Sequence, residues 1–235
     1  MKYYKPLFFL FCILTFCSCG KSNVHTNSNI TAFKVANIAS EEATISKDEG
    51  SIEIDCSEEG NATTDAIKAL NILKNRSGFP LATDFNAQIT LISLLEKGDD
   101  INRWSNKKAG KIIGYVKEVK VGSIETANCK ATEKDLRDTH IELVLDPNSY
   151  EKNNCVVIEV TPRLRKIMAE KGIDWSTLML RSKYLGRWVE VEGWMFFDSE
   201  HTNKAENTNP GNLTNWRGTA WEIHPVTSIK IADKH

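Results

Sequence analysis

Imidazole and carboxylate side chains gather near the C-terminal end of the sequence, on both sides of an asparagine-rich stretch. Asp198 and His201 precede this stretch, and Glu222 and His224 follow it at alternate positions. Alternate residues of a β-strand share a face, so Glu222 and His224 could bind zinc or manganese together with His201. The chain has no compact metal motif such as HExxH. A local network is the alternative to a metal site: Glu222 forms an ion pair with Arg217, and His224 forms a hydrogen bond with a loop carbonyl.

A ligand groove is the second kind of site that these residues could form. The connection from 199 to 218 is roughly twenty residues long, and compact domains rarely carry so long a connection without a functional reason. Arg163 stands near the start of a predicted helix, where the N-terminus favours anions. The candidate groove residues are Glu159, Arg163, Asp198, His201, Trp216, Arg217, Glu222 and His224.

His140 is expected to lie away from this groove. It begins a predicted strand, and a strand of eight or nine residues spans roughly 25–30 Å. His140 and His201 should therefore lie at opposite ends of the fold, with His140 paired to Asp138 or Glu142.

Aromatic residues of another predicted strand offer a different surface. Trp188, Trp194 and Phe196 share one strand face and could stack on bases or sugars. Because exposed aromatic patches of that size are uncommon, burial beneath helical segments is the favoured interpretation.

Alternating apolar residues predict five strands, in the segments KIIGYVKEVKVG, THIELVL, CVVIEVTP, RWVEVEGWMFFD and WEIHPVTSIKI. Gly114 in the first is expected to mark a bend or bulge. Two helical patterns, PRLRKIMAEKG and WSTLMLRSKYLG, separate the third strand from the fourth. This order is typical of the OB architecture, a five-stranded Greek-key barrel. The fold class is therefore predicted to be mainly β, with an OB-like barrel over residues 111–235.

The N-terminal half is predicted to contain three further regions. Residues 61–110 should form a helical accessory element, and residues 19–60, which are polar and acidic, a flexible tether. Residues 1–18 have the charged start and apolar run of a signal peptide. The segment FCSC resembles a lipobox, which implies lipidation of Cys19; an ordinary cleaved signal is the alternative. We therefore expect the bacterial cell envelope as location, with a lipid anchor in the membrane and the domain periplasmic or surface-exposed.

Charge and cysteine content limit the partners. The chain has 30 basic and 31 acidic residues, whereas general nucleic-acid binders are usually strongly basic. Nucleic acid is therefore not favoured, and the basic stretch 163–187 is interpreted as a solvated helix face. In an oxidising compartment two cysteines tend to pair, and Cys129 and Cys155 are the candidates.

The segments DTHIEL, EVTPR, DWST, GWMFFDSEH and NWRGTAWEIHPVT together resemble a family of uncharacterised bacterial exported proteins. The likeness covers roughly residues 70–231, and WEIHPVT is its most recognisable part. The resemblance implies a single exported domain and indicates no activity.

Three functions remain open, and no catalytic residue is assigned, because the chain lacks GxSxG, P-loop and GxGxxG motifs. The first is a lipid-anchored envelope module that binds a small or oligomeric ligand in the groove. The second is a metal-dependent nuclease or phosphodiesterase-like enzyme. The third is a structural envelope protein whose long loop contacts another protein.

Overall fold

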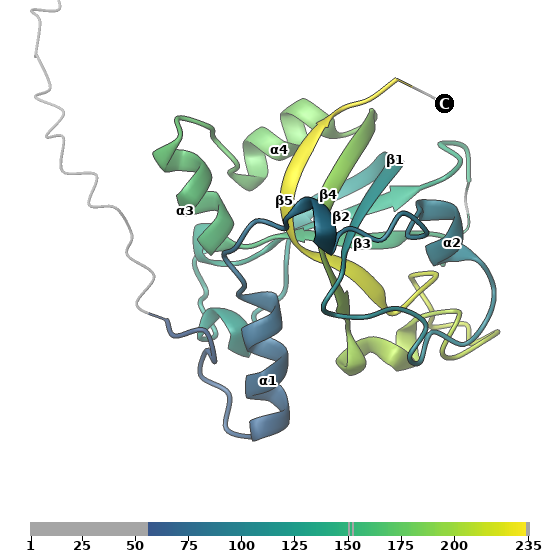
Figure 1. Ribbon diagram of the computed structural model, residues 1–235, viewed down its shortest axis with the longest axis horizontal. Helices are drawn as coiled ribbons and strands as arrows, with labels where there is room; N and C mark the ends of the chain where they lie inside the picture. Colours follow the sequence, from purple (N-terminus) through teal and green to yellow (C-terminus); the bar gives the residue numbers. More distant parts are fainter. Residues whose placement is uncertain (1–55, 150, 152, 234–235) are drawn as a thin grey trace, which may run out of the picture. The chain divides into compact units, whose positions relative to one another are not determined.

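Five strands close into a barrel (Figure 1). Their order around the barrel is β1-β2-β3-β5-β4, and β4 pairs back to β1. The β3–β5 pair is parallel and the other neighbours are antiparallel. The computed structural model, which describes residues 56–149, 151 and 153–233, thus confirms the mainly β, OB-like fold class. The strands are β1 (Ala109–Val121), β2 (Thr139–Val144), β3 (Val156–Val160), β4 (Trp188–Phe197) and β5 (Trp221–Ile231).

Two helices separate β3 from β4, where the sequence predicts two helical segments. Helix α3 (Pro162–Glu170) begins after Thr161, whose side chain accepts a hydrogen bond from the Leu164 N–H. A proline in the first turn costs no hydrogen bond, because that N–H has no partner within a helix. Helix α4 (Thr177–Tyr184) is capped in the same way by Ser176.

The chain before the barrel contains helices α1 (Asp65–Lys74) and α2 (Leu91–Leu95). Leu91 of α2 packs against β1 at Gly114, where a Cβ atom would lie 2.7 Å from the Leu91 Cδ2 atom. Gly114 is therefore required for close packing, and the register shift of β1 lies between Val116 and Glu118 instead of at Gly114, where a bend or bulge is expected. No helix within the described residues is long and apolar enough to cross a membrane.

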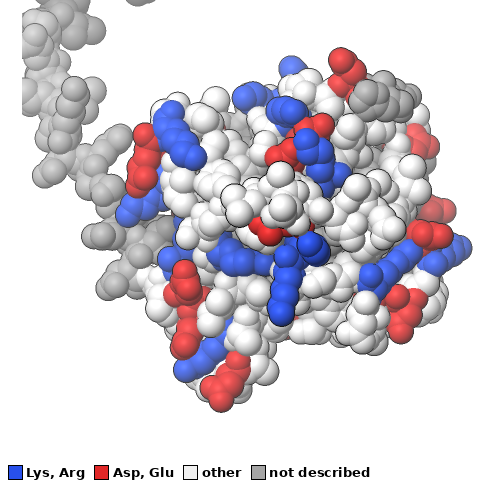
Figure 2. Space-filling model, viewed as in Figure 1, with Lys and Arg blue, Asp and Glu red and all other residues white. Residues whose placement is uncertain are grey.

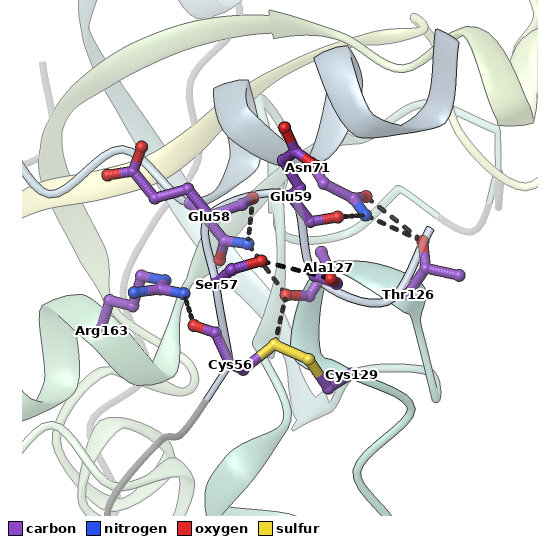
Figure 3. Close-up of a disulfide and its surroundings, with 11 residues drawn as sticks. Cys56, Ser57, Glu58, Glu59, Asn71, Thr126, Ala127, Cys129 and Arg163 are labelled. Atoms are coloured by element: carbon purple, nitrogen blue, oxygen red, sulfur yellow. Dashed lines mark hydrogen bonds between the residues drawn. A yellow bond between two sulfur atoms is a disulfide. The ribbon is translucent and has the colours of Figure 1, made fainter. Parts of the chain in front are cut away.

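A disulfide joins the start of the described chain to the loop after β1 (Figure 3). It links Cys56 to Cys129 with a Cα–Cα distance of 5.9 Å, so the expected pairing of Cys129 with Cys155 is wrong. Cys155 is buried beside β3, with its Sγ atom 3.4 Å from the Trp216 carbonyl. Residues 56–60 therefore belong to the fold, whereas the rest of the expected tether, Cys19 and the predicted signal peptide lie outside the described residues.

The polar face of β5 is covered instead of exposed. Trp221 and Ile223 belong to the barrel core, so Glu222 and His224 alternate onto the other face, yet they are only 3% and 0% exposed. Arg76, just after α1, donates a hydrogen bond to the His224 carbonyl at 3.1 Å. The end of α1 and the β4–β5 connection thus close over this strand and create a second, polar interior layer.

Candidate functional site: a pocket lined by buried charges

A pocket of about 310 Å³ lies between the barrel and the β4–β5 connection, residues 198–220. Six of the eight candidate groove residues line it: Glu159, Asp198, His201, Trp216, Arg217 and Glu222. The chain therefore gathers these residues much as the sequence predicts. The other lining residues come from α1, β1, the loop after β1, and β2: Lys74, Lys120, Val121, Gly122, Ser123, Glu125 and His140.

Hydrogen bonds hold the two ends of the β4–β5 connection together. The Trp216 N–H donates to the Lys204 carbonyl at 3.1 Å. The Asp198 side chain caps the 3₁₀-helix η4 (Ser199–Lys204) by accepting from a backbone N–H. His201, inside η4, has a non-helical backbone that marks a kink. These local features place Asp198 and His201 against the last residues of the connection.

Asp100 fixes the far end of the connection from the N-terminal segment. Its carboxylate accepts hydrogen bonds from the Thr219 hydroxyl at 2.6 Å and the Ala220 N–H at 2.9 Å. Its carbonyl accepts from the Trp221 indole N–H at 2.8 Å. Because Asp100 is fully buried, its loss would leave donors unpaired in the interior.

A continuous chain of ion pairs, here called the ionic network, begins at His201. The His201 Nδ1 atom lies 2.7 Å from the Asp198 carboxylate. Arg217 then bridges Asp198 at 3.1 Å and Glu222 at 2.7 Å, and Glu222 lies 3.3 Å from the His224 Nδ1 atom. This half confirms the predicted pairing of Glu222 with Arg217, whereas His224 contacts carboxylates instead of a loop carbonyl.

The ionic network continues from His224 to the other side of the pocket. Glu159 lies 3.3 Å from the His224 Nδ1 atom with one oxygen and 3.1 Å from the His140 Nδ1 atom with the other. The His140 Nε2 atom lies 3.3 Å from Glu142, which also accepts from Lys120 at 3.0 Å. A single path of charged groups therefore connects two exposed rims of the pocket through its floor.

His140 joins the site, contrary to the expectation that it lies at the opposite end from His201. The β2–β3 register places His140 directly opposite Glu159. The expectation was wrong because it assumed strands of eight or nine residues, while β2 has 6 and β3 has 5. The alternative pairing with Glu142 is confirmed.

Trp216 lies between the two imidazoles that face the pocket. Its ring centroid is 5.6 Å from that of His140 and 6.1 Å from that of His201. The Arg217 guanidinium carbon lies 5.3 Å from the centroid of the same indole. At this distance the electrons of the ring face attract the cation, which is a cation–π interaction. Trp216 is half-buried, so part of its surface remains available to a bound molecule.

Lys74, at the end of α1, places an ammonium group under the pocket. It donates to Glu125 at 2.6 Å, and its side chain is only 5% exposed. Burial disfavours the charged amine, but the charges of Glu125, Asp198 and Glu159 outweigh burial and raise the pKa of Lys74. Lys74 is therefore a permanent cation among buried carboxylates, and no sequence motif indicates this role.

Protonation of the pocket-facing groups follows from their neighbours. Burial disfavours the charged imidazole of His140, but hydrogen bonds to Glu142 and Glu159 raise its pKa to about 9. Burial likewise opposes ionisation of Glu159, yet the His140 hydrogen bond and the His224 charge lower its pKa to about 2. Burial also opposes ionisation of Asp198, but His201 and Arg217 hold its pKa below the usual value. His140, Glu159 and Asp198 are therefore ionised at neutral pH, whereas burial raises the pKa of Glu222.

The expected metal ligands do not converge as a group. Among the described residues, the three His, Cys, Asp or Glu side chains whose ligand atoms come within 4.8 Å of one another are Asp138, Glu159 and His224. His201 is instead bound to Asp198, and Glu222 to Arg217. Of the predicted trio His201, Glu222 and His224, only His224 belongs to this cluster. Asp138 and Glu159 take the places of His201 and Glu222.

Two other candidate groups lie outside the pocket. Arg163 donates from its Nη2 atom to the Cys56 carbonyl (Figure 3), so it holds the N-terminal segment and lines no part of the pocket. Phe196 is fully buried, which agrees with burial as the favoured interpretation. Trp194 is half-buried, and the guanidinium carbon of Arg76 lies 5.1 Å from the centroid of its ring. The ring of Trp188 packs against the ring of Tyr115.

A scan against protein-family models, a search of curated proteins and a search of solved structures each give no match. The resemblance to a bacterial exported family therefore stays a prediction.

Proposed function

We propose that the protein is a binding module of the bacterial cell envelope, and that its pocket takes a small, neutral or cationic ligand rich in hydroxyl or amine groups. The observation that carries this proposal is the set of carboxylates lining the pocket: Glu125, Glu159, Asp198 and Glu222. Carboxylates accept several hydrogen bonds each and donate none when ionised. Each ionised carboxylate has about four lone-pair sites, so it can accept from a ligand with many donors in addition to its protein partners.

Anionic ligands are disfavoured because cations of the pocket lining are already paired with carboxylates. Arg217 is already held by Asp198 and Glu222, and Lys74 by Glu125. A phosphate would therefore compete with carboxylates for cations that are engaged. The face seen in Figure 2 shows acidic and basic side chains interspersed without a large basic area, whereas nucleic-acid surfaces carry a clustered basic patch.

The shape of the pocket fits a molecule of one or two rings. Its volume of about 310 Å³ lies at the lower end of the range of small-molecule sites, roughly 300–1,000 Å³. Trp216 offers an aromatic face beside the acceptors. An apolar ring face and a rim of hydroxyl groups, as in a sugar, would meet both features at once.

Attachment to the envelope is the second part of the proposal. Its support is the signal-peptide pattern of residues 1–18 and the lipobox-like FCSC before Cys19. Cell fractionation tests it: the protein should sediment with membranes, and Cys19→Ser should release it or leave it unprocessed. Membrane association unchanged by this substitution would contradict the lipid anchor.

Ligand binding is tested by calorimetric titration of the purified protein with a fixed panel. The panel contains neutral mono- and disaccharides, amino sugars, polyamines, mononucleotides and a single-stranded oligonucleotide. We expect binding of a sugar or amine with one site per chain, and loss of at least tenfold in affinity in Trp216→Ala. Leu213→Ala is the matched control, because Leu213 is in the same connection and fully exposed.

Binding of nucleotides in preference to sugars and amines, weakened by added salt, would contradict the proposed ligand class. Equal affinity of the Trp216→Ala and wild-type proteins would place the binding site elsewhere.

A further inference from the structure

Three side chains from different parts of the fold meet behind the floor of the pocket. Asp138 precedes β2, Glu159 lies in β3 and His224 in β5. Their ligand atoms lie within 4.8 Å of one another, and they are 2%, 6% and 0% exposed. Two carboxylates and an imidazole at this spacing are a donor set that proteins use for divalent cations.

Two side-chain atoms of this trio are buried without a hydrogen-bond partner in the described structure. They are the Oδ1 atom of Asp138 and the Nε2 atom of His224. The Nε2 atom lies 3.7 Å from the Oδ2 atom of Asp138, which is too long for a hydrogen bond. Leaving a buried carboxylate oxygen and a ring nitrogen unpaired is costly. A cation between Asp138 and His224 would satisfy both.

The surroundings of His224 suit a metal-bound imidazole. Its other ring nitrogen, Nδ1, lies 3.3 Å from the Glu222 carboxylate and 3.3 Å from the Glu159 carboxylate. Metal-binding histidines usually donate their second ring N–H to a carboxylate, which fixes the ring and leaves the opposite nitrogen to the ion. Arg217 holds Glu222 in place at 2.7 Å, so the orienting carboxylate is itself fixed.

Asp138 is the least closely paired carboxylate of the three around His224. Arg217 compensates Glu222, and His140 pairs with Glu159, but Asp138 has His224 as its ion-pair neighbour at 3.7 Å. His224 is in turn shared among three carboxylates, those of Asp138, Glu159 and Glu222. Buried carboxylates are normally paired or bound to metal.

We infer that Asp138, Glu159 and His224 form a binding site for one divalent cation of the zinc or manganese type. The mixed oxygen and nitrogen donors fit these ions better than calcium or magnesium, which prefer oxygen ligands. Glu159 also lines the pocket, so the ion lies directly behind the surface that a ligand would touch. The inference does not depend on what the pocket binds.

The test begins with tag-free protein stripped with EDTA and dialysed, then titrated with ZnCl₂ and with MnCl₂ by calorimetry. We expect one ion per chain and a higher melting temperature with the preferred metal, because an ion that binds only the folded state stabilises it. Bound Co²⁺ provides a second readout, since its visible absorption reports imidazole and carboxylate ligands. Absence of both heat and a thermal shift with either metal would overturn the inference.

One ligand variant and two comparison variants test the position of the ion. Asp138→Asn keeps the shape of the side chain and should lower the affinity at least tenfold. Asp135→Asn, at an exposed position of the same loop, is the matched control and should bind as wild type. His201→Ala should also bind the metal as wild type does. If His201→Ala lost the metal while Asp138→Asn kept it, the inference would be overturned in favour of a site made by His201, Glu222 and His224. The panel titration, repeated on EDTA-treated protein, separates this result from a failure of ligand binding.

Discussion

Arg217 and Glu222 form an ion pair of 2.7 Å in which both side chains are almost completely buried. Arg217 lies in the β4–β5 connection and Glu222 lies in β5, so the pair fastens the connection to the barrel. The guanidinium of Arg217 also donates two hydrogen bonds to the backbone. Its Nε atom donates to the Thr219 carbonyl, and its Nη2 atom donates to the Ala220 carbonyl. The pocket therefore depends on a fixed guanidinium at its base.

Replacement of Arg217 by leucine should strongly destabilise the fold. Asp198 and Glu222 would stay buried without their cation, and removal of one partner of a buried ion pair costs about 3–5 kcal/mol. Urea denaturation measures this loss. Arg187→Leu, at an exposed position, should change the free energy of unfolding by no more than about 0.5 kcal/mol. Similar small changes in both variants would contradict the role of the pair.

Asp100 should control the pocket from outside it. In Asp100→Ala the Thr219 hydroxyl and the Ala220 N–H lose their buried acceptor, at a cost of roughly 1–3 kcal/mol each. We expect a less stable protein that also binds the panel ligand more weakly, since the end of the connection is released. Asp99→Ala serves as control because Asp99 is exposed. Unchanged affinity in a folded Asp100→Ala protein would show that this anchor does not shape the pocket.

The contribution of His201 to stability should depend on pH. Its hydrogen bond to Asp198 raises the His201 pKa above 6.5, with burial and Arg217 opposing and Glu222 assisting. A histidine whose pKa is higher in the folded state than in the unfolded state stabilises the fold. This contribution is complete at pH values below the pKa of the unfolded state, and it is lost as the pH rises through the pKa of the folded state. The stability difference between wild type and His201→Ala should thus be larger at about pH 5.5 than at about pH 8.5. Thr202→Ala, which removes no titrating group, should show no such trend.

Removal of the Cys56–Cys129 disulfide should lower the free energy of unfolding by about 2–5 kcal/mol. The bond closes a separation of 73 residues and fixes the loop that carries Glu125 into the pocket. Thermal unfolding of a Cys56→Ala/Cys129→Ala variant, with and without dithiothreitol, measures the effect. The reductant should lower the melting temperature of the wild type and of Cys155→Ala but not of the double variant. An equal response in all three would contradict a structural disulfide.

Local sequence patterns predict the barrel and most of the pocket. Alternating apolar residues identify each strand, and the chain order then leaves few arrangements other than the OB-like one. Asp198 and Trp216 come together because the strands they flank are neighbours. The unusual length of the connection is the signal that marks the site.

Residues brought in by long-range packing could not be predicted in the same way. Lys74 belongs to a helix whose pattern predicts only an amphipathic face, and its burial depends on carboxylates far away in sequence. Asp138 and His140 stand in the segment DTHIEL, which the resemblance singled out, but their positions depend on strand lengths and register. Spacing along the chain likewise does not show that Cys56 lies beside Cys129.

The measurement that tests the pocket most directly is an NMR titration of the indole N–H signals of the six tryptophans. The titrant is the sugar or amine that binds most tightly in the panel, and Trp216 is assigned from a Trp216→Phe variant. We predict that the Trp216 signal shifts most, while those of Trp188 and Trp194 stay within the spread of the remaining indoles. Largest shifts at Trp188 and Trp194, or a Trp216 signal unmoved at saturation, would contradict a binding pocket beneath the β4–β5 connection.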